Sequence, residues 1–387
     1  MSRLDERGDP EVFTDHNVYI LGAGFSRPAG VPLLNDFLME MRSSLNWLSN
    51  ANRRSELQAI RDVLIFRKSA SGAALRVNLN VENIEDLFSL AAASGQNPLA
   101  ETVSTAIAAT LSYARRTPAP HALLVSVKRG IKVPETWEER VGATDVIKYM
   151  APFYDLCAGM LVGRWCQPRR YMKNTVLTFN YDTVLEESLS NIGVKCSYGF
   201  EHSSVEYDKS AKHVTRKAEN NALPVHKLHG SVNWATPLKE RGKLRVFGSY
   251  DDLLKANRQV LLIPPTWRKT FGGPLTSIWD AAVKALTEAT QIIIIGFSIP
   301  PTDIHFKYLL AAGLQENISL RKIYCLNPDA TVEENLFEIL RTDLKDNGFV
   351  SVYGSRCENI FTDHTQHNYF TFPRLFERDF ADNITFG

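Results

Sequence analysis

Four short polar turns, each at the end of an apolar run, constrain the fold of this chain most strongly. They are Gly22-Ala23-Gly24-Phe25-Ser26, Thr178-Phe179-Asn180-Tyr181-Asp182, Leu228-His229-Gly230-Ser231 and Gly296-Phe297-Ser298, and a fifth, Leu326-Asn327-Pro328, follows the last such run. The preceding runs are short and rich in β-branched residues, which is typical of buried parallel strands. Ligands bind outside the carboxyl ends of the strands in an open parallel sheet, so these turns are expected to converge on one crevice. The pattern predicts a nucleotide site on an α/β sheet.

Between the first and second turns the apolar residues recur every three to four positions, which is the period of an amphipathic helix. We expect helices over 34–48, 57–64 and 84–91, around Ala106, and over 146–162. After the second turn, Thr183-x-x-Glu186 has the form of a capping box, and Gly193 suits the end of its helix. Further strands are expected at 175–178, 224–228, 260–263, 292–295 and 322–326, and further helices over 278–289 and from Thr331.

The length of 387 residues favours two domains, or one large domain with an insertion. The pattern divides the chain into a discontinuous sheet domain (1–34 and 171–348), a helical insertion (35–170) and an aromatic-rich C-terminal segment (349–387). Disordered tails are poor in aromatic residues, so we expect this last segment to pack on its own domain or on a partner.

Charge and cysteine content exclude several classes. The 44 basic and 43 acidic residues nearly cancel, so no overall field attracts the chain to nucleic acid or a membrane. The polar amino terminus and the absence of a long apolar run predict a cytoplasmic protein. The five cysteines, Cys157, Cys166, Cys196, Cys325 and Cys357, form no Cys-x-x-Cys pair, which argues against structural zinc and a disulfide framework.

The first turn has the chemistry of a phosphate-binding loop. Glycines let the backbone approach a pyrophosphate, and the following helical turn offers amide donors. A tight strand-to-helix connection explains Gly-x-Gly as well. The third glycine, Gly30, lies six residues after Gly24, which departs from the dehydrogenase spacing.

The same turn resembles the opening motif of the sirtuin (SIR2) family, Gly-Ala-Gly-x-Ser-x-x-x-Gly-Ile-Pro, which stands here as Gly22 to Pro32 with Val31 in place of Ile. The other turns resemble the sirtuin Thr-Gln-Asn-x-Asp, His-Gly, Gly-x-Ser and late Asn motifs, in the same order. The resemblance runs from Val18 to about Pro328. It implies a Rossmann-like parallel sheet that binds NAD.

Departures from the sirtuin pattern point to water as the acceptor. The zinc ribbon cysteines are missing, Leu33-Leu34-Asn35 replaces the Phe-Arg of deacylating sirtuins, and Phe179 replaces the Gln. The sequences of segments 228–234 and 295–303 resemble those of bacterial SIR2-like antiphage-defence proteins, which hydrolyse NAD. The expected enzyme is therefore an NAD glycohydrolase that needs no metal.

Three residues are the catalytic candidates. Asn180 can hold a water or a ribose hydroxyl, and His229 can act as a general base, unless the first only forms a turn and the second only packs. The resemblance implies that Asp182 holds the nicotinamide carboxamide, whereas the start of a helix at Thr183 favours a capping role. The cofactor-binding candidates are Gly22, Ala23, Gly24, Phe25, Ser26, Pro32, Thr178, Gly296, Phe297, Ser298 and Asn327.

Other polar positions have competing interpretations. His226 and His229 point to opposite sides of an extended strand, and Gly230 favours His229 as the pocket residue. Asn83 to Leu87 resembles an acidic helix that the defence proteins place near the cofactor, but a solvated helix face explains it equally. Asp303 fits helix-dipole stabilisation. The pairs Arg53-Arg54, Arg115-Arg116 and Arg169-Arg170 fit solvated surface.

The resemblance also implies regulation, because NAD hydrolysis is toxic. It suggests a homo-oligomer, or a partner such as a DNA-translocating hexameric ATPase or an Argonaute-type protein. Two other functions stay open: a non-catalytic module in which NAD or ADP-ribose controls assembly, and an NAD-dependent deacylase or ADP-ribosyltransferase.

Overall fold

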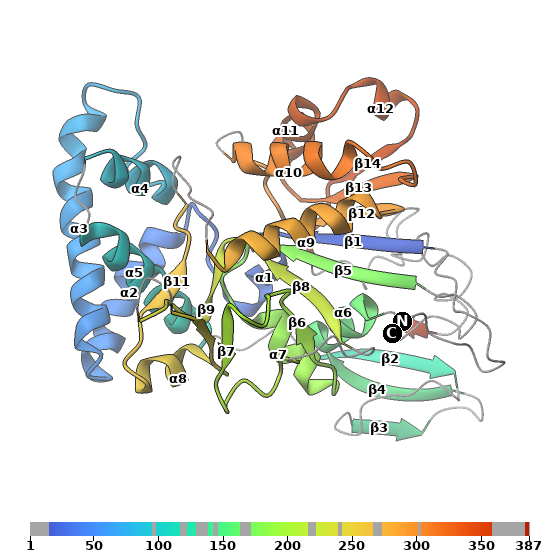
Figure 1. Cartoon of the computed structure of the whole chain (residues 1–387), viewed down its shortest axis with the longest axis horizontal. Helices are drawn as coiled ribbons and strands as arrows, with labels where there is room; N and C mark the ends of the chain where they lie inside the picture. The colour runs from blue at the N-terminus through green and yellow to red at the C-terminus, as the bar shows by residue number, and fades with distance from the viewer. Residues whose placement is uncertain are drawn as a thin grey trace.

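The computed structural model describes residues 15–94, 98–116, 122–128, 138–141, 146–162, 172–215, 222–238, 242–265, 273–300, 303–357 and 384–386. Its centre is a seven-stranded sheet in the order β14-β13-β12-β1-β5-β8-β6 (Figure 1). These strands are β1 (Asp15–Leu21), β5 (Met172–Thr178), β6 (Cys196–Ser197), β8 (Leu223–Lys227), β12 (Gln291–Ile295), β13 (Lys322–Leu326) and β14 (Val350–Tyr353). All neighbouring pairs run parallel, which confirms the α/β class predicted from the sequence.

The strand register brings the polar turns to one edge of the sheet. Leu21, the last residue of β1, pairs with Thr178 of β5 on one side and with Ile295 of β12 on the other. Ile295 pairs in turn with Leu326, and Thr178 pairs with Lys227. Five strands therefore end at the same level, and the turns that follow them start side by side, as the sequence predicts.

Helices connect these strands and cover one end of the molecule. They are α1 (Ala23–Ser26), a 3-10 turn η1 (Arg27–Ala29), α2 (Phe37–Asn50), α3 (Arg54–Ala74), α4 (Ile84–Ala93), α5 (Pro98–Ala114), α6 (Phe153–Leu161), α7 (Val184–Asn191), α8 (Tyr250–Lys255), α9 (Leu275–Thr287), α10 (Ile304–Leu314), α11 (Thr331–Ile339) and α12 (Asp343–Asp346). α2 to α5 pack together, away from the centre of the sheet (Figure 1). α6 packs on β5 and α7, and α9 packs on β8.

Two smaller sheets complete the fold. The first has the order β11-β9-β10-β7, from β7 (Val205–Tyr207), β9 (Gly230–Ala235), β10 (Leu244–Val246) and β11 (Val260–Leu262). The second has the order β15-β2-β4-β3, from β2 (Ala122–Lys128), β3 (Glu138–Val141), β4 (Val146–Pro152) and β15 (Ile384–Phe386).

The expectation of a purely helical segment over 35–170 is therefore wrong, because β2, β3 and β4 lie within it. The single helix expected over 146–162 is strand β4 followed by α6. Pro152 explains the boundary: proline disrupts a helix interior, and here it occupies the N-cap position of α6.

The capping box predicted at Thr183 and Glu186 is also wrong. At the start of α7, the Thr183 hydroxyl donates to Glu187, and Asp182 Oδ1 accepts the Val184 amide at 3.0 Å. Glu186 instead pairs with the buried ammonium of Lys227. At the start of α11, Asp329 Oδ1 accepts from the amide of Thr331 at 3.0 Å. In both places the carboxylate of an Asp, two residues before the amide that donates to it, provides the cap.

The C-terminal segment is described only in part. β14 adds an edge strand to the main sheet, and β15 pairs antiparallel with β2. Residues 358–383 and 387 lie outside the described part, so the packing expected for most of this aromatic-rich segment stays a prediction.

The basic pairs of the helical end make specific contacts instead of only facing solvent. The guanidinium groups of Arg53 and Arg116 lie 4.7 Å and 5.1 Å from the ring centroid of Trp47. Arg115 forms an ion pair with Glu187. Arg169-Arg170 falls outside the described residues.

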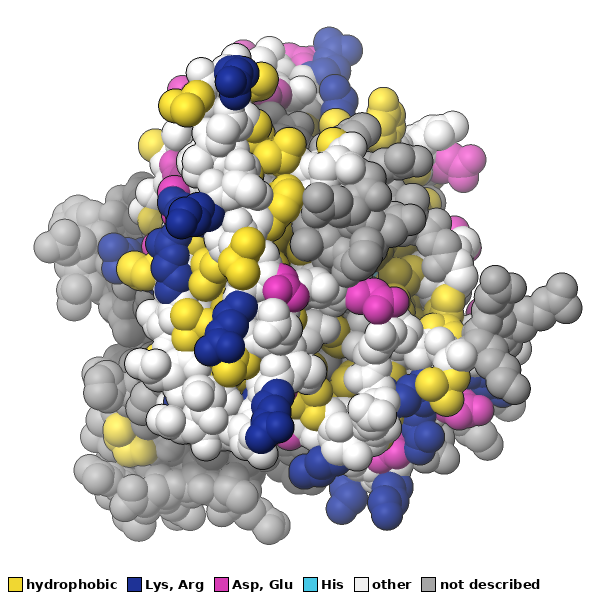
Figure 2. All heavy atoms as spheres, turned by 90° about the vertical axis from the view of Figure 1, so that its left-hand side faces the viewer, with side chains coloured by type: hydrophobic (Ala, Val, Ile, Leu, Met, Phe, Trp, Pro, Cys, Tyr) yellow, Lys and Arg dark blue, Asp and Glu magenta, His cyan; other side chains and the backbone are white. Residues whose placement is uncertain are grey.

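On the outer face of the helical end, the charged side chains of the described residues are scattered (Figure 2). Figure 2 views the side covered by α3 and shows basic and hydrophobic side chains interspersed. Across the described ranges, no helix is both long enough and apolar enough to cross a bilayer.

Candidate functional site

A cavity of about 640 Å³ opens at the carboxyl edge of the main sheet. Residues that follow β1, β5, β8, β12 and β13 line it, together with the first residues of α4 and the segment after β14. All the predicted site residues line this cavity except Phe25, Ser26 and Thr178. The crevice lies beside β1, where the strand order reverses, which is the usual ligand position in such sheets.

The glycine-rich turn after β1 packs directly against the turn after β12. The amides of Gly22 and Gly24 donate to the carbonyls of Ile295 (3.0 Å) and Gly296 (2.8 Å), and the amide of Phe25 donates to the carbonyl of Gly22 at 3.0 Å. A Cβ on Gly22 would lie 2.4 Å from Phe297 Cα, and one on Gly296 would lie 2.3 Å from the Phe25 nitrogen. These glycines allow the two turns to meet, and the amides of Gly22, Gly24 and Phe25 are bonded within the protein.

Asn180 has a fixed amide orientation. Its Nδ2 group donates to the carbonyl of Gly22 at 2.8 Å and to Ser26 Oγ at 3.1 Å, and its backbone amide donates to Thr178 Oγ1 at 3.1 Å. Both side-chain N–H bonds are therefore used within the protein. Because Asn180 lines the cavity, its carbonyl Oδ1 is the atom with which the side chain can accept a hydrogen bond from a bound molecule.

Asp182 caps the start of α7 and also lines the cavity. Its Oδ1 accepts from the Val184 amide and from Ser26 Oγ at 3.1 Å, and the residue also lines the cavity. Burial raises the pKa of the Asp182 carboxyl, and the nearby ammonium of Lys227 opposes this rise. The capping interpretation is thus correct without removing Asp182 from the cavity wall.

His229 and His226 lie on different sides of the chain, as expected. His229 lines the cavity and is 5% exposed, with its ring 5.0 Å from Phe179 in an edge-to-face arrangement. His226 is turned away: its Nδ1 lies 3.1 Å from the carbonyl oxygen of Tyr198, and burial lowers its pKa. Gly230 allows the turn after His229 to approach β11, because a Cβ there would lie 2.4 Å from the carbonyl oxygen of Leu261.

An aromatic cluster forms one wall of the cavity. Phe179 and Phe297 stack with their ring centroids 4.7 Å apart and an interplanar angle of 7°. Phe306 of α10 meets both rings edge-on. The cluster connects the turns after β5 and β12, so the residue that replaces the sirtuin Gln is a packing residue beside the cavity.

Asn327 and Ser298 lie at the far side of β1 from His229. Asn327 is buried; its Nδ2 donates to the carbonyl of Phe297 at 3.1 Å, and its Oδ1 accepts the Asp329 amide at 3.0 Å. Both contacts lie within the turns after β12 and β13. Ser298 lines the cavity and precedes Ile299, a buried β-branched residue with φ of 48°. Strained backbone of this kind often occurs at functional sites.

Phe25, Ser26 and Thr178 lie behind the cavity and hold its wall. Ser26 connects Asn180 to Asp182 through its hydroxyl. The hydroxyl of Thr178 donates to the carbonyl of Leu21 at 3.0 Å, across the junction of β5 and β1. The prediction that these three residues contact the ligand directly is not supported by their positions.

Several lining residues were not selected from the sequence. Arg27 and Arg356 are the basic side chains among the described lining residues, and Glu85 and Asp303 are acidic ones. Asn83 caps α4 by accepting the Glu85 amide at 2.8 Å, so the acidic segment reaches the cavity with the start of a helix. The resemblance of segment 83–87 to an acidic helix near the cofactor was the sequence signal for this position. The sequence contains no such signal for Arg356, which follows the edge strand β14.

In the described residues, no group of three or more His, Cys, Asp or Glu side chains is arranged to hold a metal ion. Four cysteines of this part of the chain are buried and form no disulfide: Cys157, Cys196, Cys325 and Cys357.

Comparison with protein families gives an independent assignment. The family model described as a SIR2-like domain matches residues 174–344, from β5 to α12. Over this range the chain is similar to the SIR2-like family. The matched range contains Asn180, His229, Gly296 and Asn327, whereas β1 and its glycine-rich turn lie outside it.

Solved structures similar to this chain include Sir2 proteins. They include a Sir2 bound to an acetylated peptide (12% identity, 89% of each chain covered, TM-score 0.36), a Sir2–p53 peptide–NAD⁺ complex (13%, 89% of each, 0.33) and Sir2Tm bound to a propionylated peptide (12%, 89% of each, 0.35). A comparison with curated proteins gave no match.

Proposed function

We propose that this chain is an NAD glycohydrolase that cleaves NAD to nicotinamide and ADP-ribose. The SIR2-like domain supports NAD binding. The observation that carries the proposal is that one cavity brings Asn180 and His229 together beside the glycine-rich turn. Water is the proposed acceptor, because the chain lacks the zinc cysteines and the Phe-Arg pair of deacylating sirtuins.

The geometry suggests how NAD would lie. The adenosine would occupy the side of β12 and β13, near Asn327 and Arg356, and the diphosphate would lie near β1. The nicotinamide ribose would then lie over the turns after β5 and β8, between Asn180 and His229. This order follows the strand order of the sheet.

The reaction breaks the bond between ribose C1′ and the nicotinamide nitrogen. Nicotinamide leaves with the electron pair of that bond, and a water oxygen forms the new bond to C1′. In the proposed mechanism Asn180 Oδ1 accepts a hydrogen bond from the water or a ribose hydroxyl, and His229 takes the released proton and returns it to solvent. The products are nicotinamide, ADP-ribose and one proton.

The test is incubation of purified protein with NAD, followed by chromatography of the products. We expect His229→Ala and Asn180→Ala to lose nicotinamide release, by roughly 100-fold or more for loss of a general base. His226→Ala is the matched control, because His226 is equally buried and lies outside the cavity. Equal release by wild type and His229→Ala would refute the assignment.

We further propose that the activity serves antiphage defence by depleting NAD in the cytoplasm, under control of a homo-oligomer or a partner such as a DNA-translocating ATPase or an Argonaute-type protein. This rests on the sequence resemblance. Cellular NAD measured after infection, with wild type and His229→Ala compared, tests it. Unchanged NAD in infected cells that express wild type would argue against the role.

A further inference from the structure

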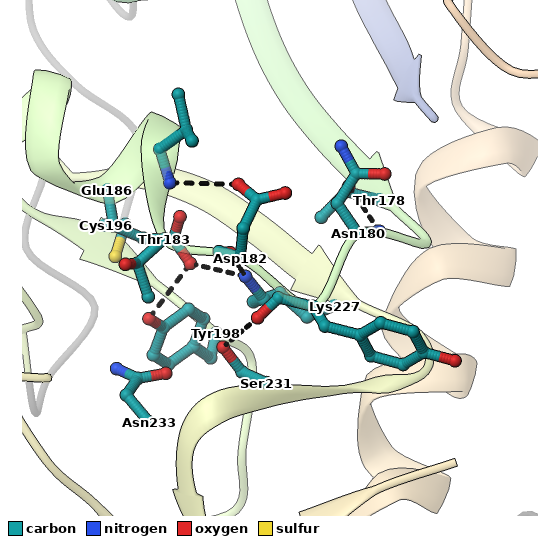
Figure 3. Close-up of polar contacts among 12 residues, drawn as sticks. Thr178, Asn180, Asp182, Thr183, Glu186, Cys196, Tyr198, Lys227, Ser231 and Asn233 are labelled. Carbon is teal, nitrogen blue, oxygen red and sulfur yellow. Dashed lines mark hydrogen bonds and ion pairs between the residues drawn. The ribbon is translucent and has the colours of Figure 1, made fainter. Parts of the chain in front are cut away.

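A buried ion pair lies directly beneath the turn that carries Asn180 and Asp182. Lys227 ends β8 and Glu186 lies on α7, and their side chains are 1% and 3% exposed. Lys227 Nζ and Glu186 Oε1 are 2.9 Å apart (Figure 3). Burying two charges costs several kcal/mol of desolvation, so a pair of this kind is weak evidence for stabilisation of the fold.

The pair is linked to the cavity by hydrogen bonds to the backbone and to the side chain of Asp182. Lys227 Nζ donates to the backbone carbonyl of Asp182 as well as to Glu186 (Figure 3). The carboxylate of Asp182 accepts from Ser26 Oγ at 3.1 Å. Ser26 Oγ in turn accepts from Asn180 Nδ2 at 3.1 Å.

The direction of these bonds depends on the charge of Asp182. A hydroxyl has one proton, so a Ser26 hydroxyl that donates to the carboxylate presents its lone pairs to the Asn180 amide. An ionised carboxylate is a much stronger acceptor than a protonated one. Protonation of Asp182 would release the Ser26 hydroxyl to rotate, and its proton would then oppose the Asn180 N–H group.

Burial alone works against the ionised state. It raises the pKa of Asp182, the charge of Glu186 raises it further, and the charge of Lys227 lowers it. Tyr154 of α6 also interacts electrostatically with Asp182. Glu186 is surrounded by Tyr198, Cys196 and His213. Lys227 is the cation within this set.

We propose that Lys227 is a positioning residue that keeps Asp182 ionised, so that the Asn180 carboxamide stays fixed with Oδ1 available to the cavity. The proposal deepens the proposed function, on which it rests only for the meaning of Asn180 in catalysis. In this proposal the charge of Lys227 favours the ionised state of Asp182, and Glu186 holds the Lys227 side chain in place beneath the turn.

NMR on the full chain tests the proposal without any enzymatic readout. The carboxyl ¹³C signal of Asp182 is titrated in wild type, Lys227→Met and Glu186→Gln. Loss of a cation should raise the titration midpoint by about one pH unit or more, and loss of an anion should lower it. Exchange of the Asn180 side-chain amide protons at neutral pH should become at least about tenfold faster in Lys227→Met, because the bond to Ser26 weakens.

The two variants separate a charge effect from general damage. A purely structural pair predicts midpoint shifts in the same direction, or none, and that result would overturn the proposal. If Lys227→Met does not fold, the Asp182 titration midpoint in Glu186→Gln is the test. A midpoint that does not fall in that variant would equally overturn the proposal. Lys173→Met is the matched control: it removes the partner of Glu288 in an exposed pair and should leave Asn180 exchange unchanged.

The kinetic readout follows the same signs. The acid limb of the pH–rate profile for NAD cleavage should move to higher pH in Lys227→Met and to lower pH in Glu186→Gln. Both shifts should vanish when Asp182 is also replaced by Asn. If the acid limb instead reports protonation of His229, it would still move in that background. Correct NMR shifts without any NAD cleavage would refute the proposed function and leave this inference standing.

Discussion

The hydroxyl of Tyr154 donates a hydrogen bond to the carbonyl of Phe25 at 2.8 Å and accepts one from the amide of Ala29 at 3.2 Å. Tyr154 lies on α6 and Phe25 lies on the glycine-rich turn, so a helix from the middle of the chain holds the turn after the first strand. The two rings also meet edge-on, with centroids 5.5 Å apart. One residue thus supports the turn by both packing and hydrogen bonding.

Tyr154→Phe should destabilise the protein and loosen this turn. It removes one donor and one acceptor while keeping the ring, so the free energy of unfolding should fall by about 1 to 3 kcal/mol. NAD affinity should fall with it. Urea unfolding and calorimetric titration measure the two effects. Tyr308→Phe removes an exposed hydroxyl on α10 and should change neither; equal effects of both variants would contradict the supporting role.

Gly296→Ala should separate the two halves of the cavity wall. Gly296 has φ of 61°, and a Cβ there would lie 2.3 Å from the Phe25 nitrogen. The steric conflict adds to the cost of a positive φ, which is on the order of 1 kcal/mol. Gly193→Ala is the matched control, because Gly193 also has a positive φ, 71°, and no atom lies within 4 Å of the new Cβ.

The difference between these two variants isolates the contact between turns. We expect Gly296→Ala to lower the free energy of unfolding by at least about 2 kcal/mol more than Gly193→Ala, and to abolish NAD binding. Comparable losses from the two would show that only the backbone conformation matters at Gly296.

Arg27→Gln should weaken NAD binding if Arg27 contacts the diphosphate. Arg27 lines the cavity and pairs with Asp36 at 2.9 Å, and its side chain is half exposed. Loss of one exposed charge-assisted contact should raise the Kd for NAD by about tenfold, and should reduce its dependence on salt. Binding assays at two ionic strengths measure both.

Asp36→Asn distinguishes the ligand role from a structural role of the same pair. It breaks the ion pair but leaves the guanidinium free for a phosphate, so affinity should stay equal or improve. A loss of affinity equal to that of Arg27→Gln would mean that the pair only holds the 30–35 loop.

Acid should destabilise the protein through His16. Burial lowers the pKa of His16 to about 4, with Lys173 adding to the effect and Glu288 opposing it. The unfolded state, with a pKa near 6.5, then binds a proton that the folded state does not. Stability should fall as the pH drops from about 6.5 to about 4, by at most roughly 3 kcal/mol from this group.

His16→Gln should reduce this slope, measured by urea unfolding at several pH values. It should not remove it, because burial also lowers the pKa of His213 and His226. His202→Gln, at an exposed position, should leave the slope unchanged. An unaltered slope in His16→Gln would contradict the assignment.

The sequence predicted the sheet edge well because strand ends are local features. The run Ile292–Ile295 and the glycines after Leu21 specify a strand and a turn without any tertiary information. The support beneath the site was not predictable in this way. Lys227 looks like the polar end of a strand, and only the approach of α7 shows that its partner is Glu186. The sequence pattern therefore predicts a capping role for Glu186, and it contains no signal for the contact of Tyr154 with the glycine-rich turn.

The central position of β1 has a practical consequence for dissecting this protein. The family match starts at residue 174, yet β1, from the amino-terminal end, lies between β5 and β12. A fragment trimmed to the match would lack the middle strand of its own sheet and expose two unpaired strand edges, which invite aggregation. The same arrangement makes the protein a candidate for split complementation, in which a separately supplied amino-terminal piece restores the sheet and its cavity together.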